Sequence, residues 1–117
     1  MATWQGRPIK RGRVYRAALE HVGEPKYYLV VSGNRRNDAL PQVLAVRLTT
    51  SPKPAIPSVV ELRSPQDGPF DGRAACDDIE TLWPDELRRD LGALTPAAMG
   101  RIAAGLRAAL DIPVTVD

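Results

Sequence analysis

The segment Lys26–Ser51, KYYLVVSGNRRNDALPQVLAVRLTTS, decides the fold. It holds two short apolar runs, Tyr27 to Val31 and Val43 to Leu48. Both are rich in Val, Leu and Tyr, which predicts buried strands rather than helices. Residues 33–41, GNRRNDALP, lie between the runs and predict a loop, because Gly, Asn, Asp and Pro favour turns.

Polar side chains stand at the ends of these two predicted strands. The first strand follows a lone cation, and the second ends in three consecutive hydroxyl residues. Two adjacent arginines lie in the predicted loop. Such a set of cations and hydroxyls can hold a phosphate backbone. The residues concerned are Lys26, Arg35, Arg36, Thr49, Thr50 and Ser51.

Length and composition predict one ordinary globular domain. The chain has 117 residues, 44% of them hydrophobic and 26% charged. No apolar run approaches the roughly 20 residues of a membrane helix, and the N-terminus has no signal-peptide pattern, so we expect no membrane association. The single cysteine, Cys76, has no partner for an internal disulfide, which favours a reducing, cytoplasmic location.

Positive charge is concentrated near the N-terminus. Between Arg7 and Arg16 there are five basic residues and no acidic one, although the net charge of the chain is only +2. A basic face of this kind is typical of a protein with an anionic partner, most often nucleic acid. A solvated basic surface without a partner is the alternative explanation.

The rest of the chain predicts further short strands and one helix. Thr95 is an N-cap followed by Pro96, and apolar residues then recur at helical spacing until Pro113. Several strands with one terminal helix predict a small, strongly bent antiparallel barrel. The strands are expected at residues 13–19, 58–62, 73–76 and 79–82, besides the two already described.

Metal-independent acid–base chemistry is the catalytic class that the residues fit best. RNA cleavage by the substrate's own 2′-OH needs a base, an acid and cations for the phosphorane charge. One His and one Cys show no metal-site spacing, and no cofactor motif is present. Each candidate alone has a structural explanation, as an exposed loop histidine, a backbone-capping carboxylate or a strand-end hydroxyl. The candidate catalytic residues are His21, Lys26, Thr49, Arg73 and Asp77.

Five motifs, in order along the chain, resemble the MazF/PemK/Kid toxins of bacterial toxin–antitoxin systems. They are IKRGRVYRAAL (9–19), GEPKYYLVVS (23–32), NRRNDALPQVLAVRLTTS (34–51), ACDDIETL (75–82) and LGALTPAAMGRIAAGLRAALDI (91–112). The resemblance implies an N-terminal arm at 1–8, a toxin domain at 9–112 and a C-terminal tail at 113–117. It also implies an SH3-like small barrel with a C-terminal helix, and a homodimer.

The resemblance implies residue roles as well. Thr49 matches the family's active-site threonine, Asp77 the aspartate base of Kid-type members, and His21 lies in the loop of that subgroup's histidine. Two positions depart from the pattern. Lys26-Tyr27 replaces a catalytic Arg-Pro, and Ala75 replaces an arginine for which Arg73, on the same strand face, is the expected substitute.

The expected function is that of a metal-independent toxin endoribonuclease. It would cut single-stranded RNA at short motifs through the 2′-OH and be neutralised by an acidic antitoxin lying across the arginine loop and the active-site loops. We expect RNA contacts from Arg13, Arg35, Arg36, Thr50 and Ser51. The alternatives are a gyrase-directed, non-catalytic poison of the same fold, like CcdB, and a degenerate RNA-binding member without turnover.

Overall fold

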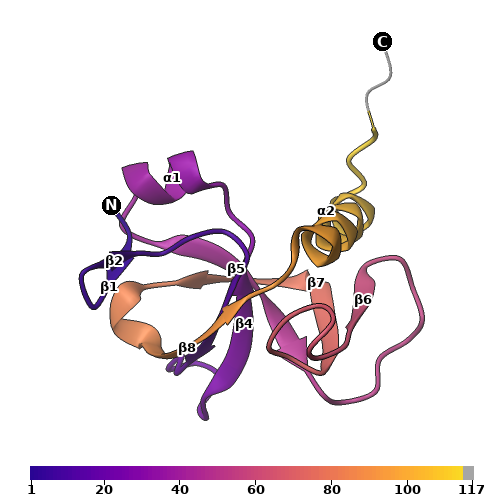
Figure 1. Ribbon diagram of the computed structural model, residues 1–117, viewed down its shortest axis with the longest axis horizontal. Coiled ribbons are helices and arrows are strands. Elements are labelled where there is room, and N and C mark those ends of the chain that lie inside the picture. The colour runs from indigo at the N-terminus through magenta and orange to yellow at the C-terminus, as the bar shows by residue number, and fades with distance from the viewer. Residues whose placement is uncertain (115–117) are drawn as a thin grey trace.

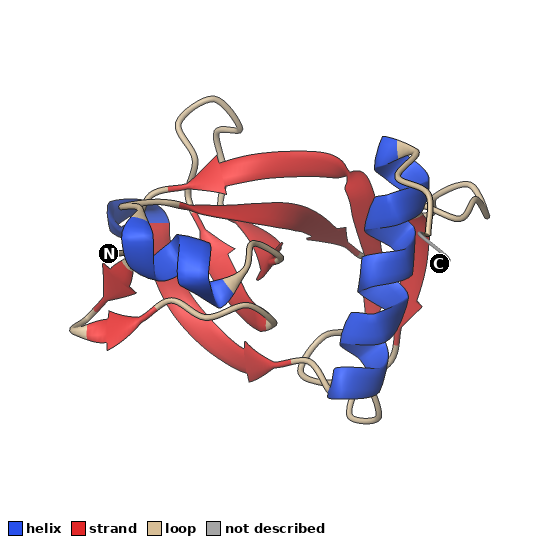
Figure 2. Ribbon diagram, turned by 90° about the horizontal axis from the view of Figure 1, so that it is seen from above, coloured by secondary structure: helices blue, strands red, loops and turns tan. Residues whose placement is uncertain are grey.

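The computed structural model describes residues 1–114. Its core is a six-stranded, strongly bent antiparallel sheet with a long helix packed beside it (Figure 1, Figure 2). The mainly β fold with a C-terminal helix is confirmed. In spatial order the strands are β6 (Val59–Leu62), β7 (Gly72–Leu82), β5 (Val43–Thr49), β4 (Lys26–Val30), β3 (Arg13–Ala17) and β8 (Leu87–Ala93).

The central strand β5 separates two hydrophobic clusters. Its side chains alternate between the faces of the sheet, so that Val46 and Leu48 join one cluster while Val43 and Ala45 join the other. The first cluster packs against the C-terminal helix, α2 (Pro96–Leu110). The second is closed by the N-terminal segment and by β8. A strand buried on both faces explains why residues 43–48 form an almost continuous apolar run.

Bulges bend the sheet towards a barrel shape. The register between β3 and β8 shifts twice, and the register between β5 and β7 shifts once, between Val46 and Arg47. Extra residues on one strand of an antiparallel pair bend that strand and increase its twist. The bulge in β7 holds Cys76, Asp77 and Asp78, which separate Ala75 from Ile79 in the pairing with β5. The residues expected to form two strands are therefore one bulged strand of 11 residues.

Helix α2 begins and packs as its sequence predicts. The Thr95 hydroxyl accepts a hydrogen bond of 3.2 Å from the Ala98 N–H, as an N-cap should. Gly105 lies directly on the sheet, since a Cβ atom there would approach Cys76 Sγ and Val60 Cγ2 to 2.9 Å. The missing side chain lets the helix sit close to β6 and β7. Among residues 1–114, no helix is long and apolar enough to cross a membrane.

The N-terminal residues, expected to form a loosely held arm, are a folded β-hairpin. Strands β1 (Thr3–Trp4) and β2 (Arg7–Pro8) pair around a two-residue turn at Gln5 and Gly6, both with positive φ. Ala2 and Ile9 are buried, and the Ala2 N–H donates to Asn37 O at 2.9 Å. The hairpin is thereby attached to the body of the protein.

Two elements differ from the sequence prediction. Residues 34–39 of the predicted arginine loop form a short helix, α1 (Asn34–Ala39), near the N-terminus (Figure 1). The buried Asn37 side chain stabilises it by hydrogen bonds with Ser32. Strand β8, which follows the short 3-10 helix η1 (Pro84–Glu86), was not predicted. Its sequence, LRRDLGA, is too polar and glycine-containing to indicate a strand, and pairing with β3 decides its conformation.

Two glycines of α2, the buried Gly105 and the exposed Gly100, give a test of this packing. Gly105→Ala should lower the free energy of unfolding by about 1–2 kcal/mol, because overpacking of about 1–3 kcal/mol exceeds the gain in helix propensity. Gly100→Ala is the matched control in the same helix and should raise it by about 0.5–1 kcal/mol, because among residues 1–114 nothing beyond the local helix backbone lies within 4 Å of the new Cβ. Urea unfolding measures the free energy of unfolding of both variants. Equal changes of the same sign would contradict the close packing of Gly105 on the sheet.

Candidate functional site

The β4–β5 hairpin sets the position of the predicted site residues. Lys26 begins β4 and Thr49 ends β5, so both lie at the open end of the hairpin. Helix α1, with Arg35 and Arg36, lies at the closed end. The seven residues of β5 separate the two ends by roughly 20 Å. The two arginines and the three hydroxyl residues therefore lie at opposite ends of the hairpin.

A cavity of about 230 Å³ lies at the open end. It contains two cations, one carboxylate, three hydroxyl side chains at the end of β5 and an aromatic wall. Its net charge of +1 suits a phosphodiester group. The residues that line it include Glu24, Lys26, Tyr27, Arg47, Thr49, Thr50, Ser51 and Phe70.

Lys26 is already paired inside this cavity. Its ammonium group donates to the Glu24 carboxylate across Pro25, and this hydrogen bond lowers the pKa of the Glu24 carboxyl. Glu24 is fully exposed, so an anionic ligand can compete for the ammonium group with little loss of stability.

Arg47 is the unpaired cation of the cavity. Its Nε donates to Leu48 O at 3.2 Å, and no carboxylate of residues 1–114 lies within ion-pair distance of its guanidinium. Arg47 stands opposite Ala75 of β7 and opposite Tyr28 of β4. The small Ala75 side chain leaves room on this face, and the bulge carrying Asp77 begins immediately beyond it.

The three hydroxyl residues Thr49, Thr50 and Ser51 form a turn that packs against β7. The Thr49 hydroxyl accepts a hydrogen bond of 3.1 Å from the Ser51 N–H. Gly72, with φ of 147°, passes so close that a Cβ atom there would lie 2.4 Å from Thr49 O. Only glycine fits this approach, which holds Thr49 in its place at the cavity.

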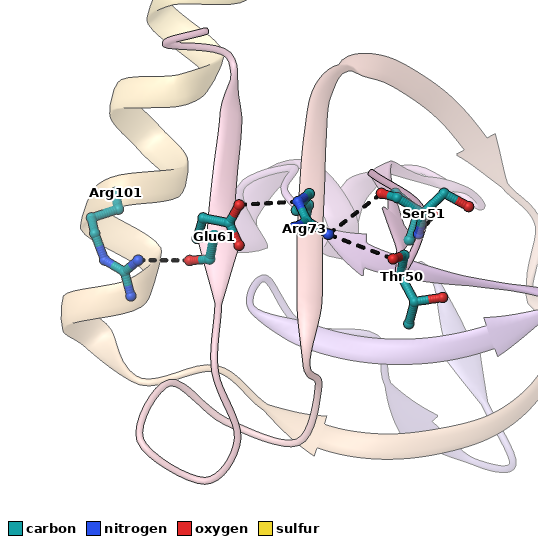
Figure 3. A network of polar contacts seen from close by, with 6 residues as sticks. Thr50, Ser51, Glu61, Arg73 and Arg101 are labelled. Atoms are coloured by element: carbon teal, nitrogen blue, oxygen red, sulfur yellow. Dashed lines mark hydrogen bonds and ion pairs between the residues drawn. The ribbon is translucent and has the colours of Figure 1, made fainter. Parts of the chain in front are cut away.

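Arg73 contacts this turn but does not line the cavity. Its Nε donates to Glu61 at 3.0 Å, and its Nη1 lies 3.5 Å from the carbonyl oxygens of Thr50 and Ser51 (Figure 3). On the other side of Glu61, Arg101 of α2 donates to the Glu61 carbonyl at 2.8 Å. Arg73 stands beside Thr49 in the sheet but is already committed to a carboxylate.

Neither His21 nor Asp77 is among the residues that line the cavity. His21 Nε2 lies 3.1 Å from the Glu80 carboxylate, which orients the ring and leaves Nδ1 free of that contact. Burial raises the pKa of the Tyr28 hydroxyl, nearby Arg47 opposes this rise, and Glu80 adds to it. Asp77 is exposed on the β7 bulge.

The other predicted groups lie elsewhere or are inert. Arg13 pairs with Asp90 at 3.0 Å, at the end of β3 away from Lys26. Cys76 is buried in the core, and this burial raises the pKa of its thiol to about 11. Within residues 1–114 no three His, Cys, Asp or Glu side chains gather where they could hold a metal ion.

Sequence reasoning missed Arg47 and Glu24. The sequence could have indicated Arg47, because it is a charged residue inside an apolar strand. By the two-residue period of a strand it also lies on the same face as Thr49. Glu24 had none, since its role depends on how the loop before β4 folds over Lys26.

Comparison with known proteins gives one consistent family. The sequence pattern described as "PemK-like, MazF-like toxin of type II toxin-antitoxin system" matches residues 10–110. The chain is 45% identical over 103 residues to "Endoribonuclease MazF4" of Mycobacterium tuberculosis, covering 88% of this chain and 93% of that protein. "Endoribonuclease MazF1" of Mycobacterium bovis has the same identity and coverage.

Solved structures agree. An "Endoribonuclease in complex with its cognate antitoxin from Mycobacterial species" superposes with a TM-score of 0.82 at 43% identity, over 92% of this chain and 99% of that one. The "Mycobacterium tuberculosis toxin MazF-mt6" superposes with a TM-score of 0.73 at 18% identity, over 87% and 99% of the two chains, and supports the fold alone.

Proposed function

Because the chain belongs to the PemK-like, MazF-like toxin family of type II toxin–antitoxin systems, we propose that it is an endoribonuclease toxin neutralised by an antitoxin protein. The observation that carries the proposal is the 45% identity to named endoribonucleases over most of the chain. The cavity with Lys26, Arg47 and Thr49 is the site that we assign to the RNA phosphate. No observation favours the gyrase-directed poison.

The proposed reaction uses the substrate's own nucleophile. The 2′-OH loses its proton and its oxygen attacks phosphorus. The P–O5′ bond then breaks, and the 5′-oxygen takes up a proton. The candidates for the two proton transfers are His21, whose ring Glu80 orients, and Asp77, which lies on the bulge of β7. Lys26 and Arg47 would neutralise the charge that builds on the phosphorane oxygens.

Arg73 has a positioning role in this proposal. Its bonds to Glu61 and to the Thr50–Ser51 carbonyls hold the hydroxyl turn, and they leave the guanidinium beside the cavity rather than in it. Arg35, Arg36 and Arg13 lie too far along the hairpin and β3 to touch the same phosphate, and they remain candidates for contacts with flanking RNA or with the antitoxin.

We also propose a homodimer. The exposed large apolar side chains include Leu40, Ile79 and Trp83, and a two-fold pairing would cover such side chains. Sedimentation at micromolar concentration should give about 26 kDa, twice the 12.8 kDa of one chain. A 12.8 kDa species under those conditions would exclude the dimer.

The reaction class is tested by the product ends. Long single-stranded RNA incubated with the purified protein in EDTA should be cut to fragments with 2′,3′-cyclic phosphate and 5′-OH ends, whereas a metal nuclease that activates water would leave 5′-phosphates and stop on chelation. Adding the cognate antitoxin should abolish the cleavage. A wild-type protein that cuts no RNA would overturn the proposal and return the poison to consideration.

The phosphate assignment is tested by Arg47→Gln. Loss of one cation aimed at developing phosphorane charge should lower kcat by about 10²–10³-fold with little change in stability, because the side chain makes one hydrogen bond at the protein surface. Arg35→Gln removes the same charge at the far end of the hairpin and should leave kcat unchanged. Equal kcat values for the two variants, from single-turnover kinetics, would refute the assignment.

A further inference from the structure

A second cavity, of about 310 Å³, lies at the other end of β3. The N-terminal hairpin forms one side of it, and β3 and β8 form the other. It shares no residue with the cavity at Lys26. Its size is at the lower end of the roughly 300–1,000 Å³ of small-ligand sites. The residues used below are Trp4, Arg7, Lys10, Arg13, Tyr15 and Asp90.

The cavity has a fixed aromatic surface. The rings of Trp4 and Tyr15 meet edge to face, with centroids 5.8 Å apart and an interplanar angle of 86°. Tyr15 is only 2% exposed, so it anchors the half-buried indole. The Arg7 guanidinium lies over the indole, 5.9 Å from its centroid. An indole beneath an exposed cation is a platform on which a flat ring can stack once the cation moves aside.

The charges of the cavity are unbalanced. Asp90 accepts three hydrogen bonds from Arg13, at 3.0–3.2 Å, so this carboxylate is fully engaged by one of the three cations. Arg7 and Lys10 are exposed, and no carboxylate of residues 1–114 lies within ion-pair distance of either. Two free cations beside an aromatic ring favour a ligand that combines a flat ring with an anion, as a nucleotide does.

The two cavities lie near opposite ends of β3. Arg13, Tyr15 and Ala17 alternate to one side of β3, and Ala17 stands opposite Lys26. Arg13 and Ala17 are four residue steps apart along β3, which is roughly 13 Å. Single-strand sites on small β-barrel proteins cover about 4–16 nucleotides, so one strand can reach both positions.

We propose that the cavity beside Trp4 is a second RNA subsite, which stacks a nucleobase on the indole and holds the neighbouring phosphate with Arg7 and Lys10. The inference rests on the proposed endoribonuclease function and extends it. The site would bind RNA outside the scissile phosphate and so contribute to affinity and to the choice of flanking bases. It also gives a role to the basic cluster between Arg7 and Arg16, which the cavity at Lys26 does not use.

The two tryptophans of the chain allow a direct test. Trp83→Phe leaves Trp4 as the only indole, and Trp4→Phe leaves Trp83, which lies beside η1 and serves as the matched control. The probe is a mixed-base single-stranded 2′-deoxyoligonucleotide of about ten nucleotides, which lacks the attacking hydroxyl and is not cut. It should quench the fluorescence of the Trp83→Phe protein in a saturable way and leave that of the Trp4→Phe protein unchanged.

Binding variants give a second readout. Trp4→Ala should weaken oligonucleotide affinity by about 5- to 150-fold, the cost of one base–aromatic stack. Arg7→Gln should reduce the salt dependence of binding by about one phosphate contact without disturbing the indole. It is the safer variant should Trp4→Ala unfold the hairpin, which circular dichroism detects. Arg107→Gln, at an exposed position of α2 that lines neither cavity, is the control for charge alone, and its affinity should exceed that of Arg7→Gln.

The outcomes separate this inference from the proposed function. If the wild type cuts RNA and binds the oligonucleotide while Trp4 fluorescence and the Arg7→Gln affinity stay unchanged, the subsite is refuted and the endoribonuclease stands. If Trp4 responds to polyglutamate and not to the oligonucleotide, the cavity takes an acidic protein segment and the inference is wrong. Quenching of Trp4 by the oligonucleotide, without any RNA cleavage, would support the subsite and refute the proposed function.

Discussion

The pairing of β5 with its two neighbours is the constraint on which the rest of the structure depends. β5 lies between β4 and β7 and is buried on both faces. Its alternating side chains belong to the two hydrophobic clusters in turn. A slip of one residue would move each side chain to the opposite face, so burial fixes the register. The same register places Thr49 beside Arg73 and Arg47 beside Ala75. The geometry of the candidate site is thus a direct result of core packing.

The site combines rigid and exchangeable contacts. Gly72 and the Glu61–Arg73–Arg101 contacts hold the Thr49–Ser51 turn, and each of these groups is already engaged with protein. The cations of the cavity are less committed, since Lys26 pairs with a fully exposed carboxylate and Arg47 pairs with none among the described residues. A ligand phosphate can therefore bind without breaking the bonds that position the cavity.

The bulge in β7 has both a structural and a chemical consequence. Three residues without partners on β5 bend the strand and let the sheet curve around the second cluster. Within the same three residues, Cys76 turns into the core below Gly105, while Asp77 and Asp78 are exposed next to Arg47. An irregularity in the ladder thereby leaves two exposed carboxylates between the strand pairs formed by Val46 and Arg47.

The sequence by itself determined the strands β3 to β6, the helix from its Thr95 cap, and the place of Lys26 and Thr49 at adjacent strand ends, because these depend on apolar period and local capping. Tertiary structure alone decided that residues 34–39 form a helix, that LRRDLGA forms a strand, and that Arg35 lies far from Thr49. It also decided which charges pair. Glu24 pairs with Lys26, Glu61 pairs with Arg73, and Arg47 has no carboxylate partner within residues 1–114. Ion pairs follow from the folding of loops and the register of distant strands, for which local sequence carries no signal.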